Sequence, residues 1–342
     1  MRVRWLSFPV LILALAIVSP PAADAQERGY PFSFKNFSIE LYGGYSNLNP
    51  GDLNGNADYE EAYLQFYYVQ RFDYFHSIYG DNYTFENLRT GDERFKTINH
   101  GFPLGARIRY AISPTLSFSI GAQYLRGTQN SRSGMIVDVQ DSSGSASSSP
   151  NLLTYEFENS GFGLSASAWL LQAGAHFGWD VGSKFRVEIY FVGGPMFARC
   201  RFNSERHSTM TDQTGFRSEN VASFEMNGSA TGASAELGGQ IRLKTVRFLD
   251  IFLEGSFAFS EASGLRGPGS SQTIYEDSNT GQNVSSDSWN RQWSIPVSDV
   301  KTAWGRFRAS QAGNASDFIF GSKRFVLSLS RFQLKAGIAV RL

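Results

Sequence analysis

Eight segments of the chain alternate apolar and polar residues with a strict period of two, and this pattern constrains the fold most. In the last segment, Phe332, Leu334 and Ile338 alternate with Gln333 and Lys335. A period of two places successive side chains on opposite faces of an extended chain, so each segment is predicted to be a strand. The predicted strands cover residues 37–46, 102–112, 116–124, 169–180, 185–202, 236–244, 249–259 and 332–342.

The connections between these strands alternate between long and short. Long loops are predicted at about 47–100, 129–155, 203–232 and 261–324, and short turns at 113–115, 181–184 and 245–247. Outer-membrane barrels show this asymmetry, and each strand is near the ~9–11 residues that cross a bilayer. The predicted fold class is all-β: an antiparallel up-and-down transmembrane β-barrel of eight strands, with short periplasmic turns and long extracellular loops. A count of ten strands stays open.

The N-terminus has the pattern of a secretory signal peptide. Arg2 and Arg4 precede the apolar run Phe8–Val18, and Ala23-Asp24-Ala25 forms a small-x-small cleavage site. We therefore expect residues 1–25 to be removed and 26–342 to form the barrel with its loops, although an uncleaved anchor is the alternative. The expected location is the cell outer membrane.

Composition excludes several other classes of protein. The single cysteine, Cys200, cannot form an intramolecular disulfide or a multi-cysteine metal site. The 31 basic and 31 acidic residues balance, so no basic field favours nucleic acid as a partner. Without disulfides, an exported β-rich chain must pair the backbone N–H and C=O groups of its edge strands in another way. Closure into a barrel pairs these groups.

The strand pattern resembles the small eight-stranded outer-membrane barrels of the OmpA, OmpX and OmpW type. The C-terminal motif Lys335-x-Gly337-x-x-Val340-x-Leu342 is similar to the signal that the barrel-assembly machinery reads, with Leu in place of the usual terminal Phe. The resemblance implies four partners: outer-membrane lipid, lipopolysaccharide, the assembly machinery, and an extracellular ligand or protein.

Charged residues of both signs recur on the face predicted to line the barrel interior. Because an eight-stranded barrel is just wide enough for side chains to fill it, we expect ion pairs to plug it. Glu40 should lie near Arg107 or Arg109, and Glu188 near Arg242, because their strands are neighbours. A narrow pore is the alternative. The complete set is Glu40, Arg107, Arg109, Asp180, Arg186, Glu188, Glu236, Arg242, Lys244, Asp250, Glu254, Lys335 and Arg341.

One strand contains an apparent change of face. Phe185, Val187 and Ile189 share one parity, whereas Met196 and Ala198 share the other. The intervening Gly193-Gly194-Pro195 predicts a β-bulge, which would shift the alternation by one residue.

The histidines raise the question of catalysis. Glu205, His207 and Ser208 are the residue types of a nucleophile with its base, but they fall in a predicted loop. His176 falls near the periplasmic end of its strand. The sequence therefore predicts that the chain is not an enzyme, with no catalytic, cofactor-binding or metal-binding residues.

The first long loop contains two further patterns. Asp52, Asn54, Asn56 and Asp58, with Glu60 after them, alternate like calcium ligands, although Ala57 and Tyr63 stand where a calcium loop needs Gly and Glu. Whether calcium binds there stays open. The aromatic stretch Tyr59–Tyr79 is predicted to be a helix, capped by Asp58-x-x-Glu61 and ended by Gly80.

The predicted function is a structural or binding role through the extracellular loops, with an ion-paired interior. The main alternative is a narrow OmpW-like pore for small solutes. A lipid-modifying enzyme is a distant third.

Overall fold

The computed structural model describes residues 36–58, 60–61, 64, 73–74, 76–77, 83–141, 151–246, 248–292, 294–296, 298–302, 305–309 and 322–342. The fold of these residues is dominated by antiparallel β-structure. None of their helices is long and apolar enough to cross a membrane. The predicted signal peptide, residues 1–25, lies outside the described part of the chain.

Eight strands pair in a closed ring, in the order of the chain. Each strand pairs with the next, and β16 pairs with β1 from Ser38↔Arg341 to Leu48↔Arg331, which closes the ring. The eight predicted strands and their neighbours are thus confirmed. The strands are β1 (Phe37–Leu48), β3 (His100–Ala111), β4 (Leu116–Asp141), β5 (Asn151–Val181), β6 (Phe185–Asp212), β7 (Arg217–Val246), β8 (Leu249–Ser263) and β16 (Arg331–Arg341).

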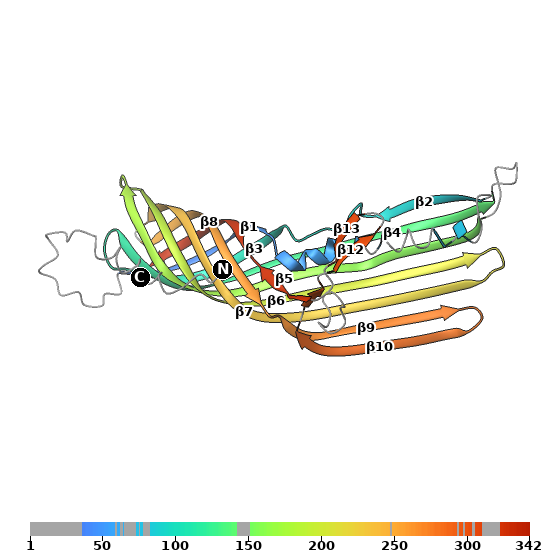
Figure 1. Cartoon of the computed structure of the whole chain (residues 1–342). Coiled ribbons are helices and arrows are strands. Elements are labelled where there is room, and N and C mark those ends of the chain that lie inside the picture. Colours follow the sequence, from blue (N-terminus) through green and yellow to red (C-terminus); the bar gives the residue numbers. More distant parts are fainter. Residues whose placement is uncertain are drawn as a thin grey trace, which may run out of the picture.

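Four ring strands continue far beyond the ring as an open sheet (Figure 1). β4, β5, β6 and β7 contain 26, 31, 28 and 30 residues, about three times the length that crosses a bilayer. β2 (Tyr83–Gly91) adds to β4, and the hairpin of β9 (Arg266–Asp277) and β10 (Gly281–Gln292) adds to β7. We call β2, β9, β10 and the projecting parts of β4–β7 the extension.

The extension corrects the predicted loops at 47–100, 129–155, 203–232 and 261–324. β4 runs to Asp141 and β5 begins at Asn151, with 142–150 outside the described residues, and only 213–216 separate β6 from β7. The segment between β8 and β16 contains β9, β10, β11 (Ser294–Pro296), β12 (Ser298–Thr302), β13 (Gly305–Ala309), β14 (Ser322–Arg324) and β15 (Val326–Ser328). Most of what the sequence indicates as loop is therefore strand.

The predicted bulge at Gly193-Gly194-Pro195 is wrong. The register of β5 with β6 is the same at Ala173↔Gly193 and at Leu170↔Met196, so no residue is inserted between these pairs. Met196 and Ala198 therefore share the inner face with Glu188, and it is the polarity of this face that changes. Real register shifts occur higher up, between Ser131 and Ser133 and between Asn159 and Gly163.

The same reversal of polarity runs around the ring. On β5, outward Leu171 is followed towards the extension by Ser167 and Ser165, whereas inward Gln172 is followed by Leu170 and Ala168. The largest cluster of buried apolar residues accordingly lies inside the extension and the adjoining end of the ring. Side chains thus keep their alternation along each strand while the environment of each face changes.

The outside of the ring is an exposed apolar band. Leu334 and Leu171 are half exposed, whereas Gln333 and Gln172 are buried inside, which confirms the predicted register of both strands. Aromatic residues bound the aliphatic band at both ends. Towards the extension these are Tyr45, Phe102, Tyr124, Trp169, Phe197, Phe257, Phe259 and Phe332, and at the opposite end Phe37, Tyr110, Phe118, Phe177, Trp179, Phe185 and Phe248.

The segment after β1 enters the extension from the ring. It begins with the 3-10 helix η3 (Gly51–Leu53) and is helical at 55–58. Asp58 therefore lies within a helix and does not cap it. Much of the predicted aromatic helix over 59–79 lies outside the described residues, although 60–61, 64, 73–74 and 76–77 are helical.

Candidate functional site

The lumen, the space enclosed by the ring, contains a network of buried ion pairs. Glu40 is fully buried and accepts hydrogen bonds from Arg107 and Arg242, and Arg109 Nη1 lies 3.6 Å from it. Arg109 also forms a bidentate pair with Glu188 at 2.5 and 2.8 Å. The predicted neighbours of Glu40 are confirmed.

A second group of charges lies in the lumen beside the first. Lys335 Nζ is 2.5 Å from Glu236 and 2.7 Å from Glu254, and the Tyr190 hydroxyl lies 2.8 and 2.6 Å from the same two carboxylates. Arg107 Nη2 donates to Glu254 at 2.7 Å and joins the two groups. Lys335 and Glu236 come from strands that are not adjacent, so pairing of neighbours does not predict their contact.

Aromatic rings fill the space between these charges. The Tyr42 and Tyr190 rings lie 5.3 and 5.5 Å from the Arg107 guanidinium, within the range of cation–π attraction. Each ring sits against a glycine, because a Cβ on Gly105 or Gly238 would come within 2.5 Å of it. Glycine at these positions lets large side chains cross the lumen and close it.

The lumen ends in an open, mostly basic pocket at the short-turn end. Arg186 donates to Glu188 at 2.5 Å and to the Pro114 carbonyl at 2.7 Å. Arg341 forms a bidentate pair with Asp250. The pocket is lined by Asn36, Phe37, Ser38, Arg109, Ala111, Ser113, Pro114, Ser117, Arg186, Glu188, Arg242, Lys244, Asp250 and Arg341. Its cations are largely matched by carboxylates from the same network.

At the opposite end, apolar side chains close the lumen. Leu125, Leu170, Met196 and Ala198 point inward and are at most 1% exposed. This layer belongs to the buried cluster that continues into the extension. A charged layer and an apolar layer therefore stand in series along the axis of the ring.

Two carboxylates attach the segment after β1 to the inner face of the extension. Glu60 is buried and accepts from Arg206 at 3.1 and 2.5 Å and from Asn159 at 3.0 Å. Glu61 forms a bidentate pair with Arg89 of β2, with both distances 2.9 Å. These contacts connect β2, β5 and β6 through one short segment.

Three of the residues considered for calcium, Asp52, Asn54 and Asn56, make contacts within the protein. Asp52 accepts from the Val326 N–H at 2.8 Å, Asn54 exchanges hydrogen bonds with the Ile98 backbone, and Asn56 donates to the Leu53 carbonyl at 3.2 Å. Among the described residues, no group of three or more His, Cys, Asp or Glu side chains has the arrangement of a metal site.

Next to this segment, Asp92 links the chain to β4. Lys96 Nζ lies 2.6 Å from Asp92, and the Arg132 N–H donates to it at 3.1 Å. The hydrogen bonds from Lys96 and Arg132 hold the pKa of Asp92 below its usual range. Asp92 therefore stays ionised to a lower pH than an ordinary aspartate.

Five aromatic rings form a row across the inner face of the extension. Phe95 lies 4.9 Å from Phe162, and successive centroid distances along the row are 5.8, 5.5 and 5.6 Å. The row continues through Phe202 and Phe224 to Trp289 on β10. Phe95, Phe162 and Phe202 are buried. The row therefore joins the segment between β2 and β3, which contains Phe95, to β10 at the edge of the sheet.

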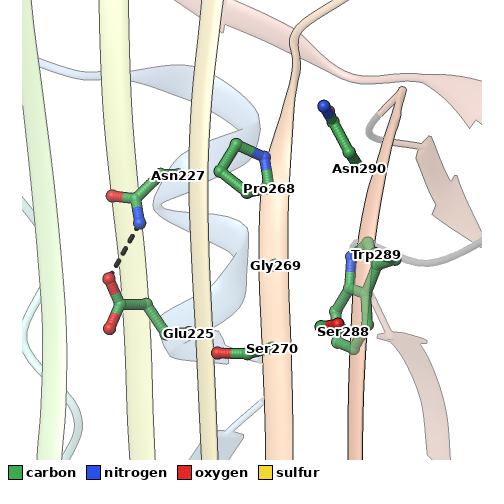
Figure 2. A pocket seen from close by; sticks show the side chains of 8 residues that line it. All are labelled: Glu225, Asn227, Pro268, Gly269, Ser270, Ser288, Trp289 and Asn290. Carbon is green, nitrogen blue, oxygen red and sulfur yellow. Dashed lines mark hydrogen bonds between the residues drawn. The ribbon is translucent and has the colours of Figure 1, made fainter.

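The outer face of the extension is polar and contains an open groove (Figure 2). Asn227 Nδ2 donates to Glu225 at 2.8 Å, and Arg201 lies 3.2 Å from the same carboxylate. The groove runs over β7, β9 and β10 and is lined by Glu225, Asn227, Pro268, Gly269, Ser270, Ser288, Trp289 and Asn290. The ring of Trp289 itself belongs to the inner-face row, where it lies 5.6 Å from Phe224. Hydroxyl, amide and carboxylate groups there can contact a polar ligand.

The residues considered for catalysis do not assemble. His207 Nε2 lies 2.8 Å from Glu219 on the outer face, whereas Ser208 is buried on the opposite face of β6 and Glu205 is exposed. His176 is buried in the lumen, 2.8 Å from the Ser119 hydroxyl. Adjacent residues of a strand point to opposite faces, so His207 and Ser208 cannot act together.

No protein-family model and no curated protein matches this chain. Among solved structures, the crystal structure of the outer membrane protease OmpT from Escherichia coli is similar to it. The identity is 8% and the TM-score 0.28, over 92% of this chain and 99% of that chain. No comparison identifies the OmpA, OmpX or OmpW type.

The same match contradicts the prediction that the chain is not an enzyme. The similar structure is that of a protease, so the non-enzymatic prediction is not kept. A TM-score of 0.28 at 8% identity assigns neither proteolysis nor a substrate to this chain.

Proposed function

We propose that the chain is an outer-membrane β-barrel protein with a closed lumen, and that the extension projects from the cell as a binding platform. The reversal of polarity along β4–β7 carries this proposal. A surface that is apolar outside and charged inside suits a barrel in lipid, and the opposite arrangement suits a sheet in water. The change from one to the other marks the proposed membrane boundary.

The dimensions of the apolar band agree with a bilayer. Trp169 and Trp179 bound it on β5 and lie ten residues apart (179 − 169 = 10). At ~3.3 Å per residue this separation is about 33 Å along the strand, and a tilt of ~40° reduces it to about 25 Å. Outer-membrane barrels have an apolar band of about this height, with aromatic residues at both edges.

The ion-pair network supports a lumen that does not conduct. Charges inside a water-filled pore are solvated, whereas Glu40, Glu236 and Glu254 are at most 1% exposed and paired with cations. The layer of apolar side chains beyond these ion pairs would also exclude ions. A narrow pore is the outcome that the following experiment would reveal.

Glu40→Gln tests the closed lumen. Removing this charge leaves Arg107, Arg109 and Arg242 with too few carboxylates, and breaking a buried pair costs ~3–5 kcal/mol. We expect a lower midpoint of thermal unfolding in detergent and no single-channel conductance before or after the substitution.

Asp180→Asn is the matched control. Its side chain is 50% exposed at the end of the lumen, where Lys244 and Arg186 pair with it, so we expect an effect below ~1 kcal/mol. Steady conductance of the wild-type protein, with a stable Glu40→Gln variant of altered ion selectivity, would overturn the closed lumen and support the pore.

The proposed orientation places the extension outside the cell and the short turns in the periplasm. A protease added to intact cells should cut at 213–216 or 278–280, the turns of the extension, and should spare 113–115 and 182–184. Cleavage confined to the second pair would mean the inverted orientation. Detection of a mature chain that begins after Ala25 would support the proposed signal peptide.

The proposed binding role belongs to the outer face and the edges of the extension. The groove over β7, β9 and β10 offers hydrogen-bonding groups to an extracellular ligand or protein. At the other end of the molecule, Lys335, Gly337, Val340 and Leu342 are the proposed contact for the assembly machinery. Gly337 also has a packing role, because a Cβ there would lie 2.5 Å from the Phe252 ring.

A further inference from the structure

Two arginines flank a serine in one row of the sheet, directly above the aromatic edge of the apolar band. Arg126 of β4 pairs with Ser167 of β5, and Ser167 pairs with Arg199 of β6. Residues paired across antiparallel strands point to the same face, and both arginines are exposed on the outer face. The small Ser167 side chain leaves the space between the two guanidinium groups open.

The row below consists of aromatic residues in the same register. Tyr124 pairs with Trp169, and Trp169 pairs with Phe197. Trp169 and Phe197 are 54% and 46% exposed, and the Tyr124 and Trp169 rings lie 5.0 Å apart. A groove crosses these strands, with these three aromatic residues at one end and Ser167, Arg199 and Ser229 at the other.

Arg126 and Arg199, like Arg266 of β9, differ from three other arginines on the outer face of the extension. Arg132 pairs with Glu158, Arg201 with Glu225, and Arg217 with Glu219. No carboxylate pairs with Arg126 or Arg199 among the residues that the structure describes. Two positive charges therefore lack a protein partner at the boundary between an apolar and a polar surface.

We propose that this groove, together with Arg126 beside Ser167, binds an outer-leaflet lipid whose headgroup is a phosphate monoester. Two strand spacings separate Arg126 from Arg199, about 10 Å, a gap that their side chains can close around one phosphate from both sides. A phosphate monoester carries close to two negative charges at neutral pH and so matches two guanidinium groups. Ser167 adds a hydroxyl donor between them.

The aromatic end of the groove selects a lipid over a soluble phosphate. Acyl chains of a lipid held at Arg126 and Arg199 would lie along Tyr124, Trp169 and Phe197 and continue onto the apolar band. Aromatic side chains at this depth favour the headgroup boundary. This inference rests on the proposed function, because it requires the band to lie in a bilayer.

Headgroup preference in bilayers tests the site. The folded protein is placed in phosphatidylcholine vesicles that contain spin-labelled phosphatidylcholine, phosphatidylglycerol or phosphatidic acid, and the immobilised fraction gives relative association. We expect phosphatidic acid to associate most strongly. Arg126→Gln/Arg199→Gln should reduce that association by about fivefold for each arginine.

The matched control is Arg132→Gln/Arg217→Gln, which removes two exposed positive charges higher on the same face. It should keep the preference for phosphatidic acid. Equal loss in both double variants, or equal association of phosphatidylglycerol and phosphatidic acid, would overturn the site in favour of general charge attraction. Displacement of the labelled lipid by inorganic phosphate would assign the groove to a soluble anion and overturn the lipid.

Failure of this inference is distinguishable from failure of the proposed function. A protein that does not enter phosphatidylcholine vesicles would contradict the barrel itself. A protein that enters them with no headgroup preference would contradict the groove alone. The heat-dependent shift in gel mobility, measured for every variant, shows whether the barrel has folded.

Discussion

Four strands, β4–β7, run through both the ring and the extension, and the two regions have opposite cross-sections. In the ring, β6 points Ile189 outward and Glu188 inward; in the extension it points Arg201 outward and Phe202 inward. The backbone pairing is continuous between the two regions. The comparison shows that alternation alone defines a strand, whereas the side on which the apolar residues lie defines its surroundings.

Each region satisfies its interior by different means. The lumen is small and enclosed, so its charges are paired by short hydrogen bonds. Removal of one charge leaves its partners buried and unpaired. The extension is open along its edges and is held by apolar packing and by a segment attached at Glu60 and Glu61. Removal of a buried charge should therefore destabilise the ring, whereas removal of a buried apolar side chain should destabilise the extension.

The largest expected effect is Phe202→Ala. Phe202 is 5% exposed and contacts Phe162 and Phe224, and removal of a buried phenylalanine costs ~3–5 kcal/mol. Proteolysis within the extension should increase sharply, while the ring keeps its heat-dependent gel mobility. The control is Phe197→Ala on the outer face of the same strand, which should leave proteolysis unchanged. Equal loss of both regions would mean that they unfold as one unit.

The second effect is that of an outward arginine. Leu171→Arg places a charge in the apolar band and should hinder membrane insertion by ~2–4 kcal/mol. Thr128→Arg places the same side chain on the exposed outer face of the extension, where water solvates it, and should be silent. The folded fraction in lipid vesicles measures both. Similar damage from the two variants would remove the proposed membrane boundary between them.

Sequence patterns predicted the ring better than the extension, for a physical reason. In the ring the apolar residues are consistently outward, so strands such as 116–124 are evident. In the extension the outward positions are Ser, Thr, Asn and charged residues, and the inward apolar positions resume on the other parity. Met135, Val137 and Val139 are an example, as are Leu164, Ala166 and Ala168. Read with a fixed apolar face, such segments indicate a bulge or a polar loop.

The lumen was only partly predictable. Neighbouring strands gave the approach of Glu40 to Arg107, because order along the chain gives adjacency in an up-and-down sheet. The contact of Lys335 with Glu236 depends on the stagger of the strands around the ring, which the sequence does not specify. The sequence did not predict the pair Arg126 and Arg199. Arg126 lies just beyond the predicted strand 116–124, and Arg199 lies near the end of the predicted strand 185–202.

The smallest expected effect tests how the segment after β1 is attached to the extension. Glu61→Gln removes a bidentate pair whose side chains are 28% and 23% exposed, so the expected cost is ~0.2–1 kcal/mol. Hydrogen exchange should increase in β2, which that pair holds, and stay unchanged in β16. Faster exchange in the ring strand would contradict the separation of the two regions.

The pairing of β1 with β16 has a consequence for folding kinetics. Ser38 and Arg341 are partners, although about 300 residues separate them. Hairpins such as β5–β6 and β6–β7 need only short turns and can form early. The ring cannot close until both of its end strands have been synthesised and have met by diffusion. Loop-closure entropy opposes that meeting, so we expect it to limit the folding rate, with the extension already paired while the first and last strands still search for each other.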